Sequence, residues 1–235
     1  GGFVVWQNMS ASSKSEQVMI QRLGTDMTGV AVATRLNRGN SEGNELNPRV
    51  AMLSDGGAVV VWETGSRANM DVLVRFLNAS GSFVTSAFPA NSHTDGNQLD
   101  ADVAVLTNGN VVVVWSSEGQ DGDGSGVYGQ LFTSSGARIG GEFQVNGATS
   151  MNQSDPAVAA MSDGRFVVAW VSESVNGRTG VGAPNLRGNI MGRIFGASGG
   201  ATGNEYRLND SSSLASAPVL AAGDDGGFLA AWTQR

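Results

Sequence analysis

Short apolar runs that end in tryptophan recur along the chain at intervals of 53 to 62 residues. Each run has three or four apolar residues before the tryptophan, which suits a β-strand, and no stretch shows the periodicity of an amphipathic helix. All five tryptophans hold this one position, which indicates an internal tandem repeat. The five runs are residues 2–6, 58–62, 111–115, 166–170 and 228–232.

A second apolar segment precedes every run except the first, and a short turn separates the two segments. The turn contains Asp-Gly or Asn-Gly, and both residues of such a pair accept the positive φ of a type I′ turn. The sequence therefore predicts a tight hairpin with a type I′ turn at the start of each unit. The four pairs are Asp55-Gly56, Asn108-Gly109, Asp163-Gly164 and Asp225-Gly226.

Two further strands complete each unit, namely a third apolar strand and a short fourth strand that ends at an asparagine. We expect the third strands at residues 18–23, 72–76, 127–132 and 190–195, and the fourth strands to end at Asn37, Asn91, Asn146 and Asn209. The connector to the next unit ends in Pro48, Ala101, Pro156 or Pro218. We expect these prolines at the first residue of a strand, where no ladder hydrogen bond is lost.

Four strands per roughly 55 residues is the content of one propeller blade. Runs such as residues 111–115 are apolar on both faces, which indicates sheets that are covered on both sides, as in sheets stacked around an axis. The sequence therefore predicts an all-β fold, a β-propeller of four-stranded blades. A β-sandwich array or a solenoid array of hairpin repeats is the alternative.

We expect a single repeat domain over residues 1–235, with units at approximately 1–47, 48–100, 101–155 and 156–217 and a partial unit at 218–235. The first unit starts at its second strand and the last stops after its second strand. We therefore expect the chain to be a fragment of a longer array. A ring of five sheets with unequal first and last blades is the alternative.

Charge and composition narrow the classes of function. The chain has 14 basic and 21 acidic residues, which gives a net charge of -7. This acidic balance disfavours a nucleic-acid partner. No apolar run is long enough to insert into a membrane. The absence of cysteine and the single histidine, His93, leave out thiol chemistry and the common histidine-based metal and acid–base sites.

The third unit carries the fullest version of a recognisable motif. Residues 120–132 read Gln-Asp-Gly-Asp-Gly-Ser-Gly-Val-Tyr-Gly-Gln-Leu-Phe, and residues 142–146 read Glu-Phe-Gln-Val-Asn. Together with the Gly-rich hairpin that ends in tryptophan, they resemble tandem repeats of large secreted bacterial proteins of the RTX (repeats-in-toxin) or adhesin-like kind. That resemblance implies an extracellular or cell-surface structural module and does not imply an activity.

Asp121, Asp123 and Ser125 alternate with glycines in one loop, a spacing from which a hard cation can collect oxygen ligands. They are the candidate ligands for Ca²⁺, and no other cofactor is expected. The loop lacks a final acidic residue, and the corresponding loops of the other units lack the Asp pair. A solvated turn is therefore the competing interpretation.

Other recurring residues are assigned to structure. We expect the tryptophans in the core rather than on a sugar-binding surface. Arg22, Arg75 and Arg193 recur in the third strands, with Gln130 in the remaining copy, and we expect the arginines to bind the neighbouring blade through carboxylates or carbonyls. The turn aspartates resemble the Asp-box hairpin of sialidase-like propellers in geometry only. No catalytic residue is predicted, because the repeat singles out no carboxylate pair that converges on a cleft.

The sequence thus favours an extracellular structural, adhesion or ligand-binding module without catalysis, whose partner is a cell-surface or matrix glycan or protein. One alternative is a carbohydrate-binding propeller lectin. The other is a propeller-fold glycan-processing enzyme, for which the long insertion at residues 176–187 of the fourth unit is the expected place of the site.

Overall fold

The computed structural model describes residues 1–9, 15–37, 43–175, 186–210 and 214–234, and every helix or strand assigned within them is a β-strand. The strands form five antiparallel sheets that follow one another along the chain. The first sheet holds β1 (Gly2–Met9), β2 (Glu16–Leu23) and β3 (Thr34–Arg35). The second holds β4 (Asn44–Met52), β5 (Ala58–Ser66), β6 (Asn69–Leu77) and β7 (Phe88–Pro89).

The remaining sheets repeat the same order of strands. The third holds β8 (Gln98–Val105), β9 (Val111–Glu118), β10 (Ser125–Phe132) and β11 (Arg138–Gln144). The fourth holds β12 (Gln153–Ala160), β13 (Phe166–Val175), β14 (Leu186–Phe195) and β15 (Tyr206–Arg207), and the fifth holds β16 (Ala215–Ala222) and β17 (Phe228–Gln234). The predicted all-β fold of repeated four-stranded sheets is confirmed.

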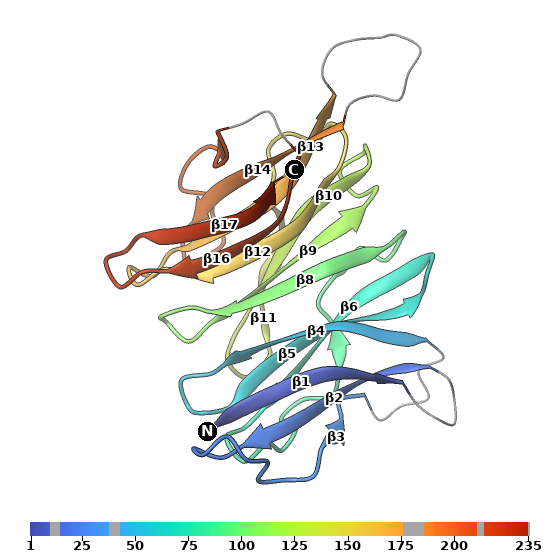
Figure 1. The fold of residues 1–235 in the computed structure, drawn as a ribbon, viewed down its shortest axis with the longest axis vertical. Helices are drawn as coiled ribbons and strands as arrows, with labels where there is room; N and C mark the ends of the chain where they lie inside the picture. The colour runs from blue at the N-terminus through green and yellow to red at the C-terminus, as the bar shows by residue number, and fades with distance from the viewer. Residues whose placement is uncertain (10–14, 38–42, 176–185, 211–213, 235) are drawn as a thin grey trace.

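The sheets stack face to face from the N-terminal to the C-terminal end of the molecule (Figure 1). The first strands of successive units, β4, β8, β12 and β16, lie side by side, and β1 packs on β4. Among the described residues no comparable contact joins the first sheet to the fifth. The stack is therefore open in this structure, and its ends do not close into a ring.

The core lies between the sheets, because the second strand of each complete unit is buried along both faces. Alternate residues of a strand point to opposite faces. In β9, Val111, Val113 and Trp115 pack toward the second sheet, and Val112 and Val114 pack toward the fourth. Trp62, Trp115 and Trp170 are at most 1% exposed, which confirms the core assignment for these three. Trp6 and Trp232, in the two end sheets, are only half-buried.

The hairpins are confirmed, but their predicted turn type is wrong. Only the glycine of each pair has a positive φ, for example 85° at Gly56, whereas Asp55 does not. The Gly56 N–H donates to the Leu53 carbonyl, so a type I turn is followed by a left-handed glycine. The Asp55 carboxylate accepts the Gly57 N–H at 2.8 Å. This bond explains the recurrence of the aspartates as turn chemistry.

The prolines lie inside their strands. The expectation that each would be the first residue of a strand is therefore wrong. Pro48, Pro156 and Pro218 are interior to β4, β12 and β16. In each strand the pairing register shifts at the proline, which marks a β-bulge. A bulged residue is left out of the hydrogen-bond ladder, so a proline costs no ladder bond there.

Arg75 and Arg193 bind a neighbouring sheet as predicted, through carbonyl oxygens, whereas among the described residues Arg22 makes no such bond. The guanidinium of Arg75 donates to the Leu36 carbonyl of the first sheet, and Arg193 donates to the Val145 carbonyl of the third at 3.0 Å. In the third sheet, whose third strand has Gln130 at this place, Arg138 makes the corresponding bond to the Ala90 carbonyl at 2.7 Å.

Candidate functional site

Four equivalent bulges line one cavity near the centre of the stack. Each places a non-glycine residue at a positive φ of 50° to 56°, a conformation that is uncommon for such residues and clusters at functional sites. Bulges re-aim side chains and are over-represented next to active sites. The four residues are Asn47 in β4, Asp100 in β8, Asp155 in β12 and Ala217 in β16.

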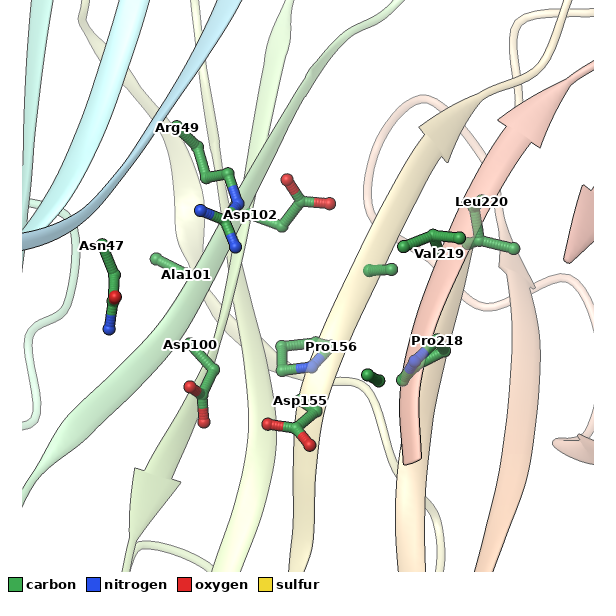
Figure 2. Close-up of a pocket in the computed structure, with 12 residues that line it drawn as sticks. Asn47, Arg49, Asp100, Ala101, Asp102, Asp155, Pro156, Pro218, Val219 and Leu220 are labelled. Carbon is green, nitrogen blue, oxygen red and sulfur yellow. The ribbon is translucent and has the colours of Figure 1, made fainter. Parts of the chain in front are cut away.

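This axial cavity has a volume of about 440 Å³, which lies in the range of ligand sites. Its walls are the first strands of four successive units. Figure 2 shows Asp100 and Asp155 side by side on β8 and β12, with Arg49 and Asp102 at another level of the same cavity. Three carboxyl groups and one guanidinium therefore face a common space.

Asp100 and Asp155 form a carboxyl pair. Burial, the charge of Asp155, the charge of Glu63 and a side-chain hydrogen bond with Asp155 raise the pKa of Asp100 to about 6. Because two neighbouring carboxyls cannot both ionise easily, Asp100 keeps its proton up to about pH 6. Such a pair can deliver a proton to a bound molecule at mildly acidic pH.

Asp102 is a third carboxyl, two residues along β8 from Asp100. Its Oδ2 accepts the Val158 N–H of β12 at 2.9 Å. Burial raises its pKa, while the N–H groups of Val158 and Val103 and the charge of Arg49 favour the ionised form. Figure 2 shows Asp102 at another level of the cavity from the Asp100–Asp155 pair.

The residue after the tryptophan holds the bulge of the next sheet in place. Glu63, which follows Trp62, accepts the Asp100 N–H at 2.7 Å and the Asn47 Nδ2 at 3.0 Å. In the first sheet, Gln7 accepts the Asn47 N–H at 3.1 Å in the same way. Burial raises the pKa of Glu63. These bonds stabilise the strained backbone that presents Asn47 and Asp100 to the cavity.

The candidate calcium ligands lie elsewhere, Asp121 and Asp123 on the connection from β9 to β10 and Ser125 at the first residue of β10, and none of them lines the axial cavity. Asp121 Oδ2 accepts the Asn146 Nδ2 at 3.3 Å, and Asp123 Oδ2 accepts the Met151 N–H at 3.1 Å. The Ser125 N–H donates to Asn152 Oδ1 at 3.1 Å. In the part of the chain that the structure describes, no group of three or more His, Cys, Asp or Glu residues is arranged to hold a metal ion. The calcium site stays a prediction.

The carboxyl pair that the structure brings together was not predicted from the sequence. The sequence does contain a sign of it at the ends of the connectors. The residue before Pro48, Ala101, Pro156 or Pro218 differs between repeats and is an aspartate in two of them. These four positions can be recognised as one set only when it is known that β4, β8, β12 and β16 lie side by side. The long insertion proposed for an enzyme site falls mostly on residues 176–185, which lie outside the described residues.

Comparison with known proteins finds no matching family model and no matching curated protein. Among solved structures, an α-L-arabinanase from Penicillium chrysogenum in complex with arabinobiose matches with a TM-score of 0.66 and 14% identity. An α-L-arabinofuranosidase from Fusarium graminearum, in complex with an iminosugar inhibitor, matches with a TM-score of 0.66 and 10% identity. Each match covers 97% of this chain and 70% of the other.

A thermostable family-43 glycoside hydrolase also matches, with a TM-score of 0.53 and 10% identity over 99% of this chain and 80% of the other. At such identities the likeness concerns the fold. It nevertheless corrects the expectation of a structural or adhesion module without catalysis, because the solved structures with this fold described above are glycan-processing enzymes.

Among the described residues, no helix has the length and apolar character required to cross a bilayer.

Proposed function

We propose that the chain is a glycan-processing enzyme of the β-propeller type, which hydrolyses the glycosidic bonds of a neutral glycan in the axial cavity. The observation that carries this proposal is the carboxyl set of Asp100, Asp155 and Asp102 around one cavity of ligand size. Glycoside hydrolysis is commonly performed by two carboxyl groups on opposite sides of the scissile bond. The likeness to arabinan-degrading enzymes supports the same conclusion.

The propeller assignment is part of the proposal. In it, each sheet is one blade, the first strands face the axis and the cavity lies on that axis. The side-by-side arrangement of β4, β8, β12 and β16 supports it. The ends of the stack are open in this structure, so a closed ring would require the first and fifth sheets to come into contact.

The roles follow from the protonation of each group. Asp100 holds a proton up to about pH 6, so it acts as the general acid that protonates the leaving oxygen as the glycosidic bond breaks. Asp155 is its positioning and charge-sharing partner. Asp102, held by the Val158 N–H, is the base that takes a proton from the attacking water. The Asp100–Asp155 pair is too close to flank a sugar ring by itself, since the two catalytic carboxyls of such enzymes lie about 5 to 9.5 Å apart.

The substrate is uncharged in this proposal. The chain carries a net charge of -7, and three of the charged groups at the cavity are carboxyls against one guanidinium. Such a field repels uronic acids and sulfated sugars and leaves neutral sugars unaffected. The predicted extracellular or cell-surface location belongs to the same proposal, because polymeric glycans are met outside the cell.

The test is hydrolysis by the purified chain of aryl glycosides of arabinose, galactose and xylose, together with arabinan and galactan, between pH 4.5 and 8. We expect one of these substrates to be cleaved, and Asp100→Asn and Asp102→Asn each to lower kcat/KM by at least about 100-fold. Asp225→Asn is the matched control, because Asn108 occupies the same turn position in the third unit. No cleavage of any substrate, or a wild-type rate in both cavity variants, would overturn the proposal.

A further inference from the structure

A second, polar cavity of about 280 Å³ adjoins the axial cavity. Asp100 lines both. The second cavity lies between the third and fourth sheets, and its walls come from the starts of β8, β10 and β12 and the C-terminal parts of β9 and β13. Its polar lining includes Ser116, Glu118, Asn152 and Glu173.

This cavity exists where the repeat changes its pattern. The residue after the tryptophan is Gln7 in the first sheet and Glu63 in the second, and both reach the bulge of the next sheet. In the third sheet the residue is Ser116, whose side chain is too short to span the same gap. The space that a longer side chain would occupy is left open beside Asp100.

Ser116 is a buried polar residue of this cavity that lacks a partner. The residue is only 5% exposed, and its Oγ has no hydrogen-bond partner. A buried hydroxyl without a partner destabilises the fold, and a hydroxyl group of a bound molecule that reached it would satisfy it. Beside it, Glu118 and Glu173 are held by Asn97 and Asn152 at 2.9 and 2.7 Å through one carboxylate oxygen each, so the carboxylates are fixed as acceptors.

We propose that the second cavity is a sugar-binding subsite, so that the substrate is an oligosaccharide that occupies both cavities with its scissile bond at Asp100. This inference rests on the proposed function. A neutral sugar unit supplies several O–H donors and acceptors on a small ring, which matches a cavity that offers carboxylate acceptors and one hydroxyl. Glycans with at least one sugar unit on each side of the cleaved bond are therefore the substrate class.

The test measures binding, so that it does not depend on turnover. Isothermal titration calorimetry of arabinotriose and of galactotriose would be carried out in the Asp102→Asn background, which prevents hydrolysis. Ser116→Gln inserts the side chain that the first sheet carries at this position, and Ser116→Ala removes only the hydroxyl. Thr233→Gln is the control. It introduces the same glutamine side chain at the equivalent exposed position of the fifth sheet, away from both cavities.

We expect one trisaccharide to bind, Ser116→Gln to raise its Kd at least tenfold, Ser116→Ala to raise it about threefold or more, and Thr233→Gln to leave it unchanged. Thermal melts check that each variant is folded. Equal Kd values in the background and both Ser116 variants overturn the subsite, even if hydrolysis by the wild type upholds the proposed function. Absence of binding by either trisaccharide overturns it as well. A Ser116-dependent Kd without any hydrolysis by the wild type upholds the sugar site and overturns the enzyme.

Discussion

Replacing Asp100 with asparagine should remove most of the pH dependence that the carboxyl pair gives to the stability of the fold. The folded-state pKa of Asp100 is about 6, against 3.8 for an unperturbed aspartate. The folded protein therefore binds this proton more tightly than the unfolded chain does. Its contribution to stability is fully present below about pH 4 and is lost as the pH rises through about 6.

The size of the effect follows from the shift. Each pKa unit corresponds to about 1.4 kcal/mol, so the wild-type protein should lose of the order of 3 kcal/mol of unfolding free energy between pH 4 and pH 7 from this pair. Asparagine carries no charge to repel Asp155 and Glu63. It also suits the backbone, because Asn47 has the same left-handed conformation at the equivalent bulge.

The assay is urea-induced unfolding of the wild type and of Asp100→Asn at constant ionic strength from pH 4 to pH 8. We expect the variant to be more stable than the wild type at pH 7.5 and to show a flatter profile between pH 4 and pH 6. Asp225→Asn, which removes an aspartate charge from a turn at the surface, should keep the wild-type slope. A parallel profile for Asp100→Asn and the wild type would refute the carboxyl pair.

Three further predictions concern the proposed reaction, the links between sheets and the loop from β9 to β10. If Asp100 is the general acid, kcat/KM should fall as the pH rises above about 6, because the proton is lost, and a profile flat to pH 8 would contradict that role. Arg193→Met should lower the unfolding free energy by about 1.5–3 kcal/mol because the bond to the third sheet is lost. Arg207→Met should cost less, since among the described residues the partners of Arg207 are two carbonyls of its own connector. If calcium binds at Asp121, millimolar calcium should raise the melting temperature relative to chelator, and Asp121→Asn should abolish the difference.

The features that the sequence predicted are local ones. The hairpins, the four strands per unit and the buried Trp115 follow from apolar periodicity and turn residues within a single repeat. The turn type was wrong because Asp55 was expected to share the positive φ of Gly56, while its carboxylate instead bonds to the Gly57 N–H. That bond favours a type I turn, in which only the glycine is left-handed.

The site depends on contacts between repeats, which apolar periodicity does not reveal. Asp100 and Asp155 are 55 positions apart in the sequence and meet only because β8 and β12 lie side by side. The raised pKa of Asp100 comes first from burial and then from the charges of Asp155 and Glu63, and none of these causes is visible in a single unit. Likewise, Ser116 is an ordinary strand residue until it is compared with Gln7 and Glu63 at the same place in their repeats.

The four bulges also bear on how such a cavity changes over evolution. Each of the four units with a described first strand contributes one bulge of the same backbone shape, and in this chain the bulges hold Asn, Asp, Asp and Ala. A substitution at one bulge would change the chemistry of the cavity, while the three other bulges would keep its geometry. Duplication of a unit would add a further bulge of the same shape. Single changes at these four positions would therefore alter the specificity of the cavity while the sheets around it stay the same.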